Sequence, residues 1–134
     1  MGWQGWPFER VVILFTCFGF LLIFVQVTLF HYRQNFRIWS QWVPVIVLPI
    51  IALNALLLSI WNMGWIRSTF IVLCIADILG GLYGFYRHFK GVGERVDGYR
   101  LQNFLVGPPV ALPLTILAMS LLGLLATYWS GGFQ

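Results

Sequence analysis

Four apolar runs of roughly 20 residues each dominate this sequence, and a run of that length can cross a bilayer as a helix. The seven tryptophans lie at or just beyond the ends of these runs: Trp3, Trp6, Trp39, Trp42, Trp61, Trp65 and Trp129. Indole combines an apolar body with one N–H donor, so it prefers the boundary between hydrocarbon and headgroups. We therefore predict an all-α membrane protein, a four-transmembrane-helix bundle, with spans at about 11–31, 42–61, 68–88 and 108–129.

Composition agrees with one membrane-embedded domain covering residues 1–134. The chain is 60% hydrophobic and 9% charged, whereas a soluble domain carries roughly one-quarter charged residues. Four spans leave only short loops. The sequence has no HExxH, no G-x-S-x-G and no cysteine–histidine metal spacing, so we expect neither catalytic residues nor a metal site, and no enzyme activity. Cys17 and Cys74 fall inside spans, where they are expected to behave as small buried hydrophobes.

The basic residues predict the orientation. Two connecting segments that share one side of the membrane carry six of the eight: Arg33, Arg37, Arg87, Lys90, Arg95 and Arg100. The opposite side carries only Arg10 and Arg67. Cytoplasmic loops are enriched in Lys and Arg, so we place the two basic segments in the cytoplasm and both termini on the non-cytoplasmic side of a bacterial-type inner membrane. These cations suit anionic lipid headgroups, and no surface suited to nucleic acid is expected.

Local sequence also suggests where helices bend and end. Pro44, Pro49 and Pro113 are expected to kink their helices, whereas Pro108 and Pro109 fit a first helical turn. Three glycines within 88–100 predict a turn-rich loop on the membrane surface, with Glu94–Arg95 and Asp97–Arg100 as acid–base neighbours. Residues 62–67 are expected to form a tight hairpin.

Asp77 is the most unusual side chain, because an aspartate at mid-span costs about 2.5–3.5 kcal/mol on insertion scales. One interpretation is a proton- or ion-binding carboxylate. The other is a buried acid that holds helices together, hydrogen-bonded to a neighbour such as Asn54. The chain has no further ionisable residue at that depth, which favours helix packing. Other residues expected in packing are Gly80 and Gly84, which have small-xxx-small spacing, and Gln26 on a stripe with Thr16 and Gly19.

His31 and His88 end the first and third spans, which places both imidazoles near the cytoplasmic interface. Two such histidines could ligate a haem, and one could ligate a chlorophyll-type pigment. The alternative is a pair of interfacial histidines beside Tyr32 and Tyr86. No other cofactor is suggested by the residues.

Three functions remain open. The favoured hypothesis is a non-catalytic accessory or anchor subunit of a larger inner-membrane complex, of an energy-transducing kind by analogy with other small anchors, in contact with other integral-membrane subunits and lipid. The second is a haem- or pigment-binding electron-transfer anchor using His31 and His88. The third is a small proton- or ion-coupled transporter or channel centred on Asp77.

The orientation is directly testable with reporter fusions. A reporter that is active only in the cytoplasm is expected to be active when fused after residue 36 or residue 95, because both positions follow basic segments. Activity from a periplasm-specific reporter at these positions would contradict the predicted orientation.

Overall fold

The computed structural model describes residues 2–129 and consists of helices joined by short connections, with no strand in that range. The elements are α1 (Phe8–Arg33), the 3-10 turn η1 (Trp39–Gln41), α2 (Trp42–Ile60), α3 (Gly64–Arg95), α4 (Leu101–Val106) and α5 (Ala111–Trp129). Four helical segments are long and apolar enough to cross a membrane: Phe8–Arg33, Trp39–Ile60, Gly64–Arg95 and Ala111–Trp129. The expected all-α architecture with four helices of membrane-spanning length is confirmed.

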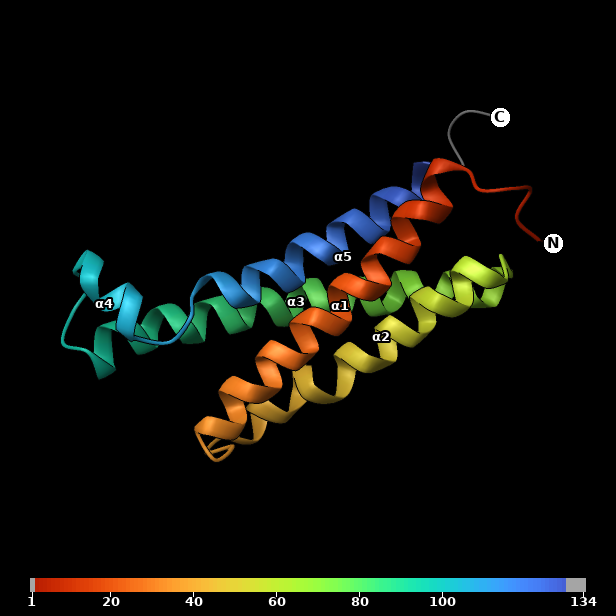
Figure 1. The fold of residues 1–134 in the computed structure, drawn as a ribbon. Helices are drawn as coiled ribbons and strands as arrows, with labels where there is room; N and C mark the ends of the chain where they lie inside the picture. The colour runs from red at the N-terminus through yellow and green to blue at the C-terminus, as the bar shows by residue number, and fades with distance from the viewer. Residues whose placement is uncertain (1, 130–134) are drawn as a thin grey trace.

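The four long helices are arranged as two pairs. The helix α1 packs along α2, and α3 packs along α5, while contacts of α1 with α5 and of α2 with α3 join the pairs. Figure 1 shows the start of α1 and the end of α5 at one end of the bundle, which we call the terminal end. The 34–38 turn and α4 lie at the other end, the basic-loop end. Toward this second end the two pairs separate, so the bundle has the form of a wedge.

The terminal end is closed by side chains that satisfy backbone groups at helix ends. The last carbonyls of a helix have no partner within it, and in a membrane they need one. The Trp3 indole Nε1 donates to the carbonyl of Leu58 at 2.7 Å, and Arg10 Nε donates to the carbonyl of Ser59 at 2.8 Å, both near the end of α2. Arg67 Nη1 donates to the carbonyl of Thr127, near the end of α5, at 2.8 Å. These bonds tie the N-terminal segment and α3 to the ends of α2 and α5.

Close approach of α3 and α5 depends on glycine. A Cβ at Gly81 would lie 3.0 Å from the carbonyl oxygen of Pro113, and one at Gly84 would lie 3.2 Å from its Cβ. A Cβ at Gly123 would lie 2.9 Å from the ring of Phe70. Small residues at such contacts allow van der Waals packing between helices, which replaces the hydrophobic effect in lipid.

Two connections differ from the sequence-based expectation. The expected loop at 88–100 is helical through Arg95, because α3 continues past the interface: 32 residues span about 48 Å, against about 30 Å of hydrocarbon. Gly91 packs against Pro108, and Gly93 lies under the ring of Tyr99. These glycines therefore allow α3 to pack against the connections on either side of α4, and they do not form turns. The ion pair formed here joins Lys90 to Glu94 at 3.5 Å.

The expected 62–67 hairpin is also shorter. Because α3 begins at Gly64, Arg67 belongs to its first turn, and Arg67 Nη2 donates to Asn62 Oδ1 at 2.9 Å.

The expected proline kinks need correction. Since α2 begins at Trp42 and α5 at Ala111, Pro44 and Pro113 lie in first turns, where a missing N–H breaks no helical hydrogen bond. Pro108 and Pro109 precede α5 instead of opening it. Pro49 is inside α2, as expected.

Gly81 and Gly80 form a matched pair for testing the α3–α5 contact. Leucine at Gly81 would collide with the α5 backbone, so Gly81→Leu is expected to lower the free energy of unfolding by about 1–3 kcal/mol. Gly80 has nothing within 4 Å of an added Cβ, so Gly80→Leu is expected to leave stability unchanged or raise it. Thermal unfolding in mild detergent measures both. Equal losses in the two variants would contradict the packing described.

Candidate functional site

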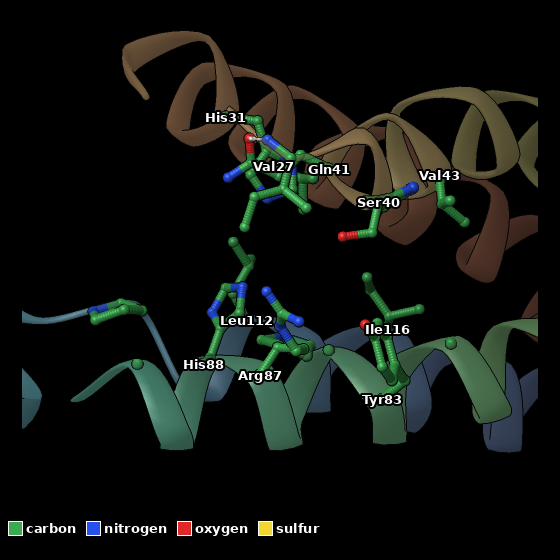
Figure 2. A pocket seen from close by; sticks show the side chains of 18 of the residues that line it. Val27, His31, Ser40, Gln41, Val43, Tyr83, Arg87, His88, Leu112 and Ile116 are labelled. Atoms are coloured by element: carbon green, nitrogen blue, oxygen red, sulfur yellow. Dashed lines mark hydrogen bonds between the residues drawn. The ribbon is translucent and has the colours of Figure 1, made fainter. Parts of the chain in front are cut away.

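A cavity of about 390 Å³ occupies the wedge between the two helix pairs. Figure 2 shows Val27, His31, Ser40, Gln41 and Val43 on the wall built by α1, η1 and α2. The opposite wall, from α3 and α5, carries Tyr83, Arg87, His88, Leu112 and Ile116. The volume of the cavity is within the range of small-molecule sites, about 300–1,000 Å³. Like such sites, the cavity is lined by apolar side chains and a few polar groups.

The imidazole of His88 is held by a backbone carbonyl of the connection that precedes α5. This carbonyl belongs to Pro109, and it also accepts from the Leu112 N–H at 3.4 Å. His88 Nδ1 donates to that carbonyl oxygen at 2.8 Å. A carbonyl can only accept, so Nδ1 carries the proton and Nε2 of the neutral ring is left as an acceptor or a metal ligand.

His31 faces His88 from the opposite wall (Figure 2). It is 8% exposed, and its Nδ1 has no hydrogen-bond partner among the described residues. The turn that follows it is well organised. The Phe36 N–H donates to the His31 carbonyl at 3.0 Å, and the ring of Phe36 stacks on that of Trp42 with centroids 4.0 Å apart. The expectation that the two histidines lie near the same end of the bundle is consistent with their shared cavity.

Asp77 lies deeper in the same cavity. Counting along α3, it is 11 residues before His88, which is about 16 Å of helix. Asp77 is 7% exposed, and its Oδ2 has no hydrogen-bond partner in the described chain. Asn54 is also buried with its Oδ1 unpartnered, and no hydrogen bond joins it to Asp77 in the described chain, unlike the packing interpretation expected. Of the small residues, Gly84 packs on Pro113, whereas Gly80 lines the open cavity.

Charged groups surround the mouth of the cavity. Arg87, Lys90 and Arg95 line it together with one acid, Glu94. The other basic residues assigned to this end, Arg33, Arg37 and Arg100, lie outside the cavity on exposed positions. Gln34 and Gln41, which the sequence did not single out, also line it, and Gln41 Nε2 donates to Gln34 Oε1 at 2.9 Å.

Gln26 is placed differently from the expectation. Its stripe partner Thr16 is fully buried, but Gln26 is exposed on the outer surface of α1 and does not line the cavity. Within residues 2–129 there is no group of three or more His, Cys, Asp or Glu side chains placed to hold a metal ion.

Comparison of the chain with known protein families, with curated proteins and with solved structures finds no match. The cavity and the exposed helix faces are therefore the basis for inferring function.

Proposed function

We propose that the protein is a non-catalytic integral-membrane subunit of a larger inner-membrane assembly. The observation that carries this proposal is the exposed position of Gln26, a primary amide on the outer face of a membrane helix. Hydrocarbon cannot hydrogen-bond an amide, so a polar side chain on this face is stabilised by a polar group of another helix.

The surface beside Gln26 has the spacing of a helix–helix interface. Large apolar side chains repeat at intervals of three and four residues along α1, and all are exposed: Phe15, Phe18, Leu22, Val25, Leu29 and Tyr32. This is the pattern by which one helix packs along another with a small left-handed crossing angle. A membrane-spanning helix of a partner subunit would cover the seam and supply the hydrogen bond to Gln26.

The basic-loop end would orient the subunit in the assembly. With Arg33, Arg37 and Arg100 facing the cytoplasm, these cations lie where anionic headgroups attract them, with about 1 kcal/mol for each basic residue near the surface.

Site-specific photocrosslinking tests the proposed seam. A photoreactive residue at Leu22, which is 72% exposed beside Gln26, is expected to form a discrete adduct with a second membrane protein in native membranes. Val72, an exposed apolar position on α3, is the control and is expected to give no discrete adduct.

Gln26→Leu should reduce the Leu22 adduct several-fold, because loss of one interhelical hydrogen bond in a membrane costs about 0.6–2 kcal/mol. Gln102→Leu, at an exposed glutamine of α4, should leave the adduct unchanged. A chain that gives no adduct at Leu22 and purifies as a monomer would contradict the proposal.

A haem- or pigment-binding role is a second candidate, because His31 and His88 face one cavity. The donor set fits such a group. The His88 ring is held through Nδ1 in the way that fixes metal-ligating histidines, and Gly80 leaves open space nearby. A bound haem would be held by His31 and His88 and would supply one-electron chemistry.

Visible absorption tests this candidate. A haem or pigment protein, purified in mild detergent, is expected to show an absorption band that is lost in His88→Ala and in His31→Ala. The band should persist in Gln34→Ala, which changes another lining residue. A colourless preparation from native membranes would rule the candidate out.

A further inference from the structure

We propose that Asp77 is a proton-binding group at the inner end of a water-filled path that is entered from the basic-loop end of the bundle. This inference concerns the isolated chain and does not depend on the proposed partner subunit.

The cavity can hold water down to Asp77. At roughly 30 Å³ per molecule, a volume of about 390 Å³ corresponds to on the order of ten waters. Other polar side chains also line it, with Ser40 and Gln41 on one wall and Tyr83 on the other (Figure 2). Asp77 lines this space and is 7% exposed, so water in the cavity would contact its side chain.

The path ends at Asp77 because the bundle is tightly packed beyond it. One turn and two turns toward the terminal end, Cys74 and Phe70 of α3 are fully buried against Gly123 of α5. Phe20 of α1 and Leu58 of α2 are fully buried in the same core. The hydrogen bonds of Trp3, Arg10 and Arg67 close the terminal end itself.

The charged and titratable groups that face this space leave Asp77 without a cation at its own depth. They come from α1 and α3 and gather toward the mouth: His31, Tyr83, Arg87, His88, Lys90, Glu94 and Arg95. The lining residues of η1, α2 and α5 include no titratable side chain, and the buried thiol of Cys74 lies one turn from Asp77 toward the terminal end. Asp77 therefore exchanges its proton with water of the path, and the isolated chain offers no continuation to the other side.

Cysteine accessibility tests the path and its sidedness. In Gly80→Cys the new thiol would lie in the cavity, and a charged, membrane-impermeant thiol reagent is expected to modify it. Leu79→Cys is the matched control, because Leu79 is at the same depth, is 63% exposed and does not line the cavity. Only the thiolate reacts, and a thiol in hydrocarbon stays protonated, so Gly80→Cys should react roughly tenfold faster or more than Leu79→Cys.

The cysteine experiment has two further controls, the natural cysteines and one variant in an exposed turn. Cys17 and Cys74 are buried, so the unmodified chain should not react. Arg37→Cys, in the exposed turn, marks the side of the membrane to which the reagent has access. The proposal requires that Gly80→Cys react only when Arg37→Cys reacts. Reaction from the opposite side, or a rate equal to that of Leu79→Cys, would overturn it.

Infrared difference spectroscopy tests Asp77 itself, using the purified chain in lipid vesicles. Between acid and alkaline buffers we expect a reversible protonated-carboxyl band that is absent in Asp77→Asn and retained in Asp97→Asn, the other aspartate of the chain. A band unchanged in Asp77→Asn would overturn the assignment. Neither experiment involves a partner, so its failure is distinguishable from failure of the photocrosslinking at Leu22.

Discussion

A bilayer interior offers no water to hydrogen-bond a free backbone group, and this constraint governs the whole structure. It accounts for the four long helices, and it accounts for how their ends are completed. Near the ends of α2 and α5 the carbonyls accept from Trp3, Arg10 and Arg67. Before the start of α5 the carbonyl of Pro109 accepts from His88 and from the Leu112 N–H. The bond from His88 orients its imidazole in the cavity.

The two ends of the bundle are physically different. At the terminal end, side chains from distant parts of the sequence join the helix pairs through specific hydrogen bonds. At the basic-loop end, the pairs diverge, and Arg87, Lys90 and Arg95 of α3 line the opening. The result is a cavity between the helix pairs that combines apolar walls with a few polar groups. Its volume is compatible with the binding of a small molecule.

The sequence was sufficient for the features that depend on length and periodicity. Four apolar runs predicted four helices, because only a helix satisfies its backbone in lipid. The sequence was insufficient where the structure depends on contacts between residues that are far apart in the chain. Gly91 and Gly93 suggested a loop, but both lie within helix α3, where they pack against Pro108 and Tyr99. Gln26 was expected in a packing stripe, yet the rotation of α1 against α2 and α5 leaves it outside. The shared cavity of Asp77, His31 and His88 depends on the divergence of the helix pairs, which no local pattern encodes.

Distance measurements between paired spin labels in lipid nanodiscs test the wedge most directly. Labels at Leu29 on α1 and Leu114 on α5 report the basic-loop end, and labels at Val11 and Leu125 report the terminal end of the same two helices; all four positions are exposed. We expect a clearly longer distance for Leu29–Leu114 than for Val11–Leu125. Equal distances would mean that the helices run parallel, and a closed bundle of that kind would contradict both the cavity and the path to Asp77.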